Sequence, residues 1–557
     1  MLPLGFSIPP IPEESRGVVY TKPWVVELLL DLADYLPASD LVDAFAVEPA
    51  SGEGAFLTAM ARRLIASCER QGRPLTDCLK SLVSYEIHEQ SAQATRVSVI
   101  EVLMDLKVDG NTARKLAETW VKTGDYLFDA ARLPRADFVI GNPPYIRLED
   151  MPAETAGFYR RSYPTMRGRA DMYIAFFEAA LRQLKDGGVC VYICADRWML
   201  NQYGAELRHL IASRFNVQTI VEMHNADAFD ADVSAYPAIT VIRRGSQGRV
   251  VVASAVAPTG PVDSRELAQS LRAVTNGQGA KPYPPIVSSA VVESWFKGSD
   301  PWPCSSPSQL ALLRHLEERF PALEDGEHTR VGIGVATGCD DVFITKDRSL
   351  VEADRLLPLA VASDTLTGHL KWSGNYLVDP WDSEGLVKLS AFPKLKSYFE
   401  THRDILCRRH TAKKNVAGWY KTIDRVTHSL KQRPKLYIPD IKDEFNPVLD
   451  NGETYPHHNL YFVVSDVWDL EVLGGILLSS IAQLFIEAYG VRMRGGYLRF
   501  QAQYLRRIRV PNPQSIKPRQ AQRLAEAFRA RDREQATMIA LEIYAIESSE
   551  LEAIRGC

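Results

Sequence analysis

The sequence has little of what marks the more specialised classes of protein. It has eight cysteines in 557 residues, and none of their spacings is typical of a zinc site. The nearest pair, Cys190 and Cys194, lies in a strand-like run that would hold the two about 13 Å apart, at about 3.3 Å per residue. That distance is too long for one metal ion or one disulfide. Scattered, reduced cysteines are typical of a cytosolic protein.

Targeting and membrane signals are also missing. The first residues, MLPLGFSIPPIPEESRG, contain no basic start and no long apolar stretch, so we expect no signal peptide. The longest apolar region, 472–486, includes two glycines, two serines and Gln483. It is short for a membrane span and is predicted to be a buried helix. We therefore expect a cytoplasmic protein without a membrane partner.

No excess of one charge is present. The 65 basic and 69 acidic side chains leave a net charge of −4, which predicts no overall attraction to nucleic acid. Any nucleic-acid surface must then be a local basic patch. The chain also contains no internal repeat and no low-complexity segment. Its length is enough for roughly two to four domains.

The first part of the chain alternates between predicted strands and helices. Strands are predicted at 42–48, 82–86, 138–141, 189–195, 217–223 and 239–243, and helices at 55–68 and 172–184. This alternation predicts an α/β fold, with a mostly parallel, doubly wound, Rossmann-like sheet in residues 1–245. In such sheets, ligands bind beyond the carboxyl ends of the strands.

The composition changes after this region. Residues 246–300 are rich in turn residues (GSQG from Gly245, APTGP, NGQGAKPYPP), and they are predicted to be a linker or junction. Residues 301–557 are richer in basic, aromatic and turn residues and end in a helical stretch near 521–554. They are predicted to form an α+β second domain.

A candidate cofactor loop follows the first strand. In AVEPASGEGAFL (46–57), Ser51, Gly52 and Gly54 let the backbone turn tightly and approach a ligand. The loop lacks both the dinucleotide spacing and the Lys-Ser/Thr ending of a phosphate loop. Its Glu-Pro start suits a cationic cofactor that carries an amino acid, with Glu48 near the positive end.

Two more carboxylates end the following strands. Glu86, in SLVSYEIHE, can accept two hydrogen bonds from ribose hydroxyls. Asp125, in TGDYLFD, can accept from an adenine amino group. Each is a weak signal alone, because acids at strand ends are often merely solvated, but their order in the chain strengthens both.

The most informative motif is Asn142-Pro143-Pro144-Tyr145, after an apolar strand. The prolines remove two amide donors, so the loop presents acceptors. The Asn142 side-chain oxygen and the Pro143 carbonyl can both accept from one exocyclic amine, which draws the nitrogen lone pair out of conjugation. The nitrogen can then attack an electrophilic methyl group, while Tyr145 offers a flat face for a base to stack on.

The order of these motifs resembles the gamma class, or TaqI type, of DNA adenine methyltransferases of restriction-modification systems. The resemblance covers nearly the whole chain and implies S-adenosylmethionine as cofactor, N6-adenine methylation in double-stranded DNA, and a bacterial or archaeal source. Carried over residue by residue, it implies that the following residues face the cofactor: Thr21, Glu48, Ala50, Glu86, Asp125, Asn142, Pro144 and Phe176. It also implies that Phe229 stacks on the target base. Asp230 stands where the class commonly has proline, so Tyr236 is the alternative.

The second half resembles the target-recognition domain of that class at 329–345 and 494–511. Residues 401–435 contain ten lysines and arginines but only two acids, and a second cluster of arginines spans 492–509. Such side chains contact phosphates, although a charge run is often only a solvated face. The DNA contacts that we expect are Arg408, Arg409, Lys413, Lys414, Arg494 and Arg506.

A duplex adenine must be flipped out of the helix to react. Tyr145 and Phe229 would stabilise it by stacking, and the methyl group would pass directly to nitrogen without a metal. Rival functions remain: N4-cytosine methylation, methylation of RNA guanine or protein glutamine, a non-catalytic DNA-binding protein that keeps this fold, and a fused nuclease. About 45 residues precede the cofactor loop, too few for a nuclease domain. We therefore expect a monomer whose cognate endonuclease, where one exists, is a separate chain.

Overall fold

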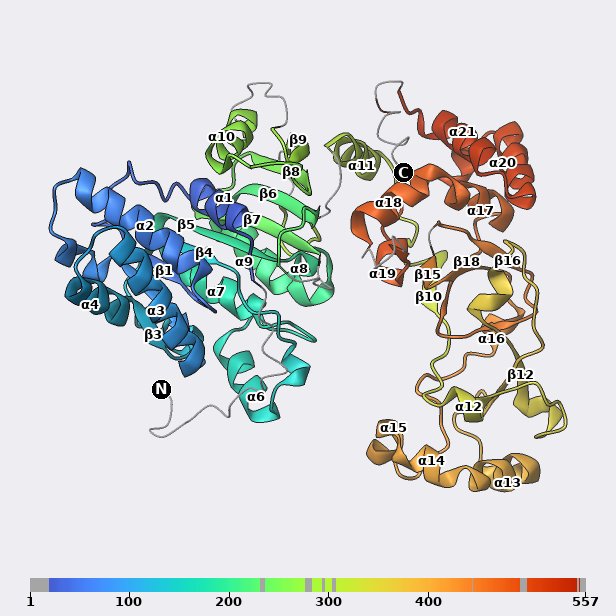
Figure 1. Ribbon diagram of the computed structural model, residues 1–557. Helices are drawn as coiled ribbons and strands as arrows, with labels where there is room; N and C mark the ends of the chain where they lie inside the picture. Colours follow the sequence, from blue (N-terminus) through green and yellow to red (C-terminus); the bar gives the residue numbers. More distant parts are fainter. Residues whose placement is uncertain are drawn as a thin grey trace. The chain divides into compact units, whose positions relative to one another are not determined.

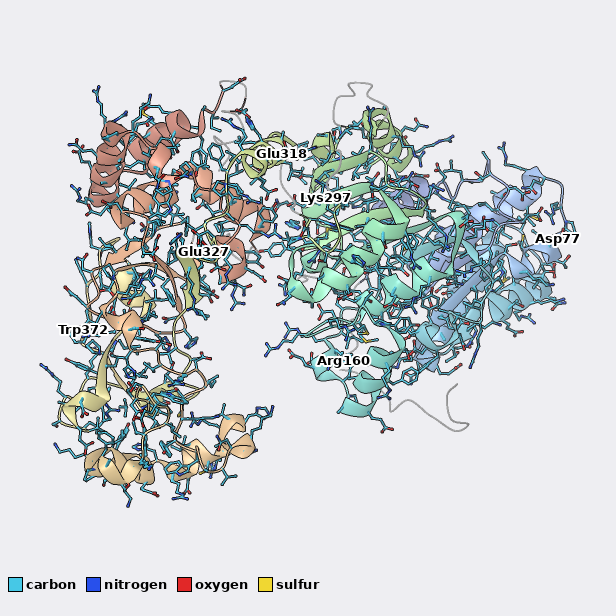
Figure 2. All side chains as sticks on the ribbon, turned by 180° about the vertical axis from the view of Figure 1, so that it is seen from behind. Asp77, Arg160, Lys297, Glu318, Glu327 and Trp372 are labelled. Atoms are coloured by element: carbon cyan, nitrogen blue, oxygen red, sulfur yellow. The ribbon has the colours of Figure 1, made fainter. Side chains whose placement is uncertain are left out.

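A computed structural model describes residues 20–230, 236–275, 283–292, 296–302, 307–442, 444–490, 498–547 and 550. The chain divides into two compact units, Met1–Pro307 and Ser308–Cys557. Each unit has its own sheets and core. In Figure 2 the label Asp77 marks the first unit and Trp372 the second.

The first unit is built on a nine-stranded sheet with the strand order β3-β2-β1-β4-β5-β7-β6-β8-β9 (Figure 1). β1 to β6 and β8 run parallel to one another, while β7 and β9 run antiparallel to their neighbours. The doubly wound α/β prediction is confirmed. The strands are β1 Ala46–Glu48, β2 Leu82–Glu86, β3 Val121–Thr123, β4 Ala136–Gly141, β5 Leu184–Ala195, β6 Phe215–Asn225, β7 Pro237–Arg244, β8 Val250–Val256 and β9 Ile286–Val292.

Helices pack against both faces of this sheet, because side chains alternate along a strand. Val189, Val191 and Ile193 of β5 belong to a core shared with one set of helices. These helices are α1 Pro23–Leu32, α2 Ala55–Arg70, α3 Glu89–Asp105, α4 Gly110–Trp120 and α10 Ser264–Thr275. Tyr192, on the opposite face, meets Phe177 of α7 with ring centroids 5.0 Å apart. The remaining helices of the unit are α5 Tyr126–Asp129, α6 Ala153–Ser162, α7 Tyr173–Gln183, α8 Arg197–Leu200 and α9 Ala205–Arg214.

The prediction of a linker over 246–300 is wrong. β8 pairs with β6 in parallel and β9 pairs with β8, so this region extends the sheet. α10, between these two strands, packs on α1. Turn-forming residues such as Pro258 and Gly260 lie in the connection from β8 to α10 and not in a joint between domains. The boundary of the first unit falls at Pro307.

Two predicted elements have different limits in the structure. The first strand was predicted from residue 42, but it is confined to Ala46–Glu48. The strand predicted from residue 189 begins at Leu184 and so includes Gly187 and Gly188. Gly187 has φ +77 and the pairing with β4 shifts register there, so the glycines bend the strand without ending it.

The second unit is a mixed α/β structure with two four-stranded sheets, β10-β18-β14-β16 and β11-β13-β12-β17, and the pair β15-β19. Its strands are β10 Thr329–Ile333, β11 Ile344–Thr345, β12 Leu356–Ala360, β13 Tyr376–Val378, β14 Lys435–Pro439, β15 Ile441–Lys442, β16 Val448–Asp450, β17 Tyr455–Pro456, β18 Leu460–Ser465 and β19 Leu498–Arg499. Its helices include α11 Pro307–Arg319, α12 Asp340–Phe343, α13 Pro393–Thr401, α14 Arg403–Arg408, α15 His410–Lys414, α16 Ser429–Gln432 and α19 Ala502–Leu505.

Four helices form the C-terminal layer: α17 Leu470–Leu478, α18 Ser480–Tyr489, α20 Pro518–Ala530 and α21 Arg533–Tyr544. The single buried helix predicted at 472–486 is two helices, α17 and α18, bent by 63°. The predicted stretch 521–554 likewise divides where Arg531 adopts a left-handed φ of 58. Of the helices described, none is long and apolar enough alone to cross a membrane, and only the bent pair α17–α18 reaches that length and composition.

Close packing of this layer depends on two adjacent glycines of α17. A Cβ at Gly474 would lie 2.5 Å from the Phe528 ring, and one at Gly475 would lie 2.6 Å from the Leu524 carbonyl oxygen. Side chains at these positions would therefore push α20 away from α17.

Candidate active site

The loop between β1 and α2 is shaped by two left-handed glycines, Gly52 (φ 53) and Gly54 (φ 90). The Gly52 amide donates to Glu86 Oε2 at 3.0 Å, and the His88 amide donates to Glu86 Oε1 at 3.0 Å. One carboxylate thus joins the loops that follow β1 and β2. This arrangement fixes the orientation of Glu86 at the carboxyl edge of the sheet.

A cavity opens at this edge, beyond the ends of β1, β2, β3 and β4. Parallel strands bring their carboxyl ends together, which is where ligands bind in such sheets. Nine of the residues predicted from the sequence line it: Thr21, Ala50, Gly52, Glu86, Asp125, Asn142, Pro143, Pro144 and Phe176. The structure therefore assembles most of the candidate site in one place.

Glu48 does not line the cavity. Its residue surface is 0% exposed, and its Oε2 accepts a hydrogen bond from the Ser84 hydroxyl at 3.1 Å. Its Oε1 has no hydrogen-bond partner among the described residues. Burial raises the pKa of this carboxyl to about 8. Glu48 lies behind the cofactor loop, and the prediction that it faces a cofactor directly has no support from this geometry.

Asp125 and Phe176 form the far wall of the cavity. Asp125 accepts from the Tyr159 hydroxyl at 2.5 Å and from the Leu127 amide at 2.8 Å, and burial raises its pKa to about 6. The Phe176 ring stacks on Tyr126, with centroids 5.9 Å apart. A buried acceptor beside an aromatic surface suits a flat, amine-bearing ring.

The Asn-Pro-Pro-Tyr tetrapeptide begins directly after β4. The Asn142 side-chain nitrogen donates to the Thr21 hydroxyl at 3.2 Å, which fixes the amide plane. Thr21 is in turn bridged to Phe229, since the Lys22 amide donates to the Ala228 carbonyl at 3.0 Å and the Asp230 amide to the Tyr20 carbonyl at 3.1 Å. Thus Asn142, Thr21 and Phe229, distant in sequence, meet at one site.

Tyr145 and Phe229 lie next to each other but do not form a parallel pair. Their ring centroids are 6.4 Å apart and their planes meet at 82°. Neither ring lines the cavity, and Phe229 is buried. The Tyr145 hydroxyl is buried without a hydrogen-bond partner among the described residues, and burial raises its pKa well above the ordinary value. Tyr145 as a whole residue is partly buried and packs against the core of the first unit.

His224 occupies a charged cluster beside this pair of rings. Its Nε2 is 2.6 Å from Asp196 Oδ2 and its Nδ1 is 2.8 Å from Glu222 Oε1. Burial alone would lower the pKa of the imidazole, but the two carboxylates outweigh it and raise the pKa to about 9. Tyr236 packs on the His224 ring at 4.7 Å. Tyr236, which the sequence analysis gave as the alternative to Phe229, is therefore already packed against His224.

Both halves of the chain match known families. Residues 81–229 match the Eco57I restriction-modification methylase, and residues 365–510 match the TaqI-like C-terminal specificity domain. The chain is 42% identical over 549 residues to the Type II methyltransferase M.PaeR7I of Pseudomonas aeruginosa, covering 98% of this chain and 94% of the relative. This chain belongs to the Type II methyltransferases of restriction-modification systems.

Other relatives agree with this assignment. The methyltransferase is 37% identical over 553 residues to M.BstVI of Geobacillus stearothermophilus, covering 97% of this chain and 98% of that protein. Among solved structures it resembles the Type IIL restriction-modification enzyme MmeI in complex with DNA, with TM-score 0.56 and 12% identity, over 96% of this chain and 73% of MmeI. At that identity, the likeness to MmeI shows the fold alone.

Sequence reasoning missed several residues that line the cavity of this methyltransferase: Tyr20, Glu53, Ile87, His88, Met151, Tyr159 and Met172. The Tyr20 hydroxyl donates to Glu53 at 2.6 Å, next to the cofactor loop. Tyr159 lies on α6 and reaches Asp125 across 34 residues. Ile87 and His88 directly follow Glu86, so their place was foreseeable, whereas Met151 and Tyr159 have no local sequence signal.

The predicted DNA-contacting residues separate into two groups. Arg408, Lys413 and Lys414 are exposed on α14 and α15, and no ion pair or hydrogen bond of their side chains is found in the described part of the chain. The side chains of Arg409 and Arg506 already have hydrogen-bond or ion-pair partners within the protein. Arg494 lies outside the described residues.

Arg409 and Arg506 are held by the protein itself. The Arg409 guanidinium donates to the carbonyls of Leu406, Thr337, Trp419 and Lys421 at 2.9–3.1 Å. Arg506 pairs with Glu324 at 2.9 Å and donates to the Val331 carbonyl at 2.9 Å. Arg409 uses its donors within the protein, so the expectation that it contacts phosphate is corrected. Arg506 also has internal partners, so the same expectation is weakened for it.

Proposed function

We propose that this methyltransferase transfers a methyl group from S-adenosylmethionine to the N6 amine of an adenine in its DNA target. The observation that carries the proposal is the Asn-Pro-Pro-Tyr loop opening into a cavity whose other walls hold Glu86 and Asp125. The N4 amine of cytosine is the nearest alternative acceptor, because the chemistry of the two amines is alike.

The cavity suits S-adenosylmethionine. Glu86 is fixed by two amides yet reaches the cavity wall, where it can accept from ribose hydroxyls. Asp125 can accept from an adenine amine, with Phe176 beside it. The cofactor supplies an electrophilic methyl group on a positively charged sulfur.

The residues of the tetrapeptide act on the acceptor amine. The Asn142 side-chain oxygen and the Pro143 carbonyl accept its two protons in hydrogen bonds, which localises the lone pair on nitrogen. With the cofactor bound, this nitrogen would be the nucleophile toward the methyl group that the cofactor supplies, and it would then release one proton to solvent. Thr21 orients Asn142 through the 3.2 Å contact, so catalysis is mainly positioning and polarisation.

The decisive experiment is long-read sequencing of a plasmid co-expressed with the protein, which distinguishes N6-methyladenine from N4-methylcytosine. We expect N6-methyladenine at one short motif. Asn142→Ala should reduce turnover at least about 100-fold, as loss of one preorganised hydrogen-bonding group does elsewhere, while cofactor binding falls much less. The proposal would be overturned if the modified base were N4-methylcytosine. It would also be overturned if the plasmid DNA stayed unmodified while the parent protein methylated RNA or protein.

The target base must leave the duplex to reach this loop. We propose that Tyr145 stacks on the flipped base while Phe229 packs edge-on against the same base. Base stacking on an aromatic side chain stabilises by about 1–3 kcal/mol. A 2-aminopurine at the target position should brighten when the protein binds. The increase should be larger with Tyr145→Ala, because the Tyr145 ring of the parent would partly quench the fluorescence. Tyr236→Ala is the matched control and should behave as the parent. An unchanged fluorescence would contradict base flipping.

DNA contact is proposed for the exposed basic surface formed by Arg408, Lys413 and Lys414. These side chains have no ionic partners in the described part of the chain, so they are free to neutralise phosphates. Such contacts position a duplex without reading its sequence.

A further inference from the structure

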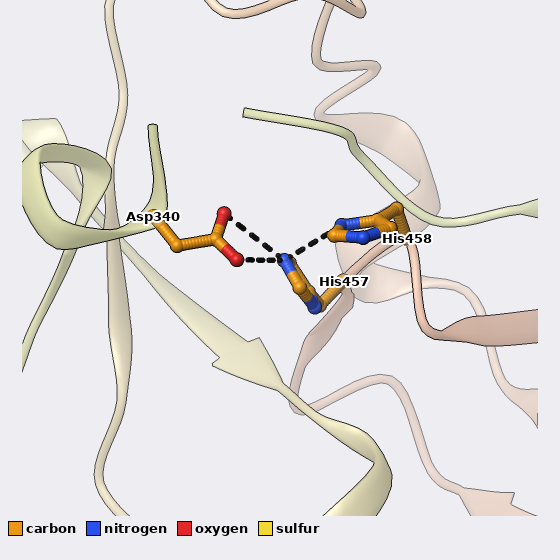
Figure 3. Close-up of side chains that lie close together, drawn as sticks. All are labelled: Asp340, His457 and His458. Carbon is orange, nitrogen blue, oxygen red and sulfur yellow. Dashed lines mark hydrogen bonds and ion pairs between the residues drawn. The ribbon is translucent and has the colours of Figure 1, made fainter. Parts of the chain in front are cut away.

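A cluster of side chains in the second unit lies outside everything described so far. Asp340 begins α12, while His457 and His458 directly follow β17 (Figure 3). His457 Nε2 lies 3.3 Å from both carboxylate oxygens of Asp340 and 2.8 Å from His458 Nδ1. Ligand atoms from all three residues lie within 4.8 Å of one another.

A single proton on His457 Nε2 cannot satisfy all the close contacts of this cluster. A ring nitrogen carries at most one proton, but His457 Nε2 faces two oxygens and one nitrogen. Two imidazole nitrogens 2.8 Å apart need either a proton between them or a shared cation. His457 Nδ1 is buried and has no hydrogen-bond partner among the described residues, so the polar interactions of this ring run through Nε2.

The distances suit a small divalent cation. With metal–nitrogen and metal–oxygen distances of about 2.0–2.1 Å, neighbouring ligand atoms of a tetrahedral zinc site lie about 3.3 Å apart. The measured separations are 2.8 and 3.3 Å. Two imidazoles and a carboxylate are a donor set that zinc accepts in proteins, with water completing the coordination.

The backbone holds the ligands in place before any ion binds. The His457 amide donates to the Ala360 carbonyl at 2.9 Å, and the His458 amide donates to the Val335 carbonyl at 3.0 Å. The Thr337 hydroxyl donates to Asp340. His458 and Asp340 are exposed, so an ion can reach the site from solvent.

We propose that Asp340, His457 and His458 bind one zinc ion. This ion would connect the loop at 337–340 to the segment 457–458. Asp340 and His457 are 117 residues apart in the sequence. The proposal does not depend on the function proposed above, because it concerns a site in the second unit and is tested by metal binding.

The test is equilibrium dialysis of the full chain against zinc, with metal content measured by mass spectrometry. We expect about one zinc ion per chain, and a weakening of at least about 100-fold in Asp340→Asn and His457→Asn, since even loss of an outer-shell partner of a metal ligand commonly costs 10–100-fold. Cobalt in place of zinc should give visible absorption bands of tetrahedral coordination in the parent but not in Asp340→Asn or His457→Asn.

The matched control is His328→Asn. His328 is an exposed histidine of the same unit that pairs with Asp466 at 3.0 Å, and its loss should leave zinc binding unchanged. Asp340→Asn keeps an oxygen that can accept from Thr337, so it guards against a variant that merely unfolds. The proposal is overturned if the parent binds no more zinc than Asp340→Asn, or if His328→Asn loses zinc equally; a cluster held by hydrogen bonds alone would give the first result.

Discussion

His224 shows how one side chain connects the end of the sheet to the loop that carries Phe229. Its two ring nitrogens face Asp196 and Glu222, and Tyr236, which directly precedes β7, packs on the ring. With a carboxylate at each nitrogen, the doubly protonated imidazolium is the stable form. Phe229 is thus held at Thr21, and Tyr236 is held at His224.

This cluster predicts a pH dependence of stability. The pKa of His224 is about 9 in the folded protein against 6.5 for an ordinary histidine, so the cluster contributes about 3 kcal/mol to the free energy of unfolding below pH 6.5, and this contribution is lost as the pH rises through 9. Urea unfolding of the parent and His224→Gln at pH 6, 7.5 and 9.5 measures it. The parent should lose its advantage at high pH, and a constant difference between the two proteins would refute the assignment.

At the scale of elements, α14 and α15 contain neighbouring arginines with opposite roles. Arg409 joins the two helices to the loop at Thr337 and to the turn at Trp419 through four carbonyls. Arg408 ends α14 and is exposed. The sequence presents the two residues as equivalent, and only the packing distinguishes them.

We expect Arg409→Ala to lower the free energy of unfolding by about 2–4 kcal/mol, because it leaves several carbonyls without donors. Arg408→Ala should change stability by less than about 0.5 kcal/mol but reduce the salt dependence of DNA binding by about one phosphate contact. Thermal unfolding and fluorescence-anisotropy titrations at several salt concentrations measure the two effects. Equal effects of both substitutions on stability would contradict this division of roles.

At the scale of the whole molecule, the two units meet the criterion for separate domains, each with its own core. β8, α10 and β9 belong to the first unit, so its natural end is near Pro307 and not near Gly245. A fragment that stops at 245 would leave the β6 edge unpaired and remove the helix that packs on α1.

A fragment of residues 1–307 should fold cooperatively and bind the cofactor, but lose sequence-specific DNA binding. A fragment of residues 1–245 should aggregate, because it exposes a strand edge and apolar surface. Gel filtration, calorimetry with S-adenosylhomocysteine and gel shifts on specific and random duplexes compare them. Should the shorter fragment stay monomeric and bind as tightly as the longer one, the extension of the sheet would be dispensable.

Features that depend only on neighbouring residues could be predicted from the sequence alone. Glycines at 52 and 54, the acid that ends Leu82–Glu86, and the prolines after Ala136–Gly141 are set by local backbone requirements, and all were foreseeable from spacing and residue type. Parallel strands place their carboxyl ends at one edge, which is why these motifs meet at one cavity.

Only the tertiary structure decided which distant segments meet. The pairing of Thr21 with Phe229, the burial of Glu48 away from the cavity, and the meeting of Asp340 with His457 join residues far apart in the chain. The turn-rich composition of 246–300 likewise concealed two strands, because pairing depends on the strands beside them. Contacts of this kind depend on the register and packing of whole elements, and no local pattern of residues encodes either.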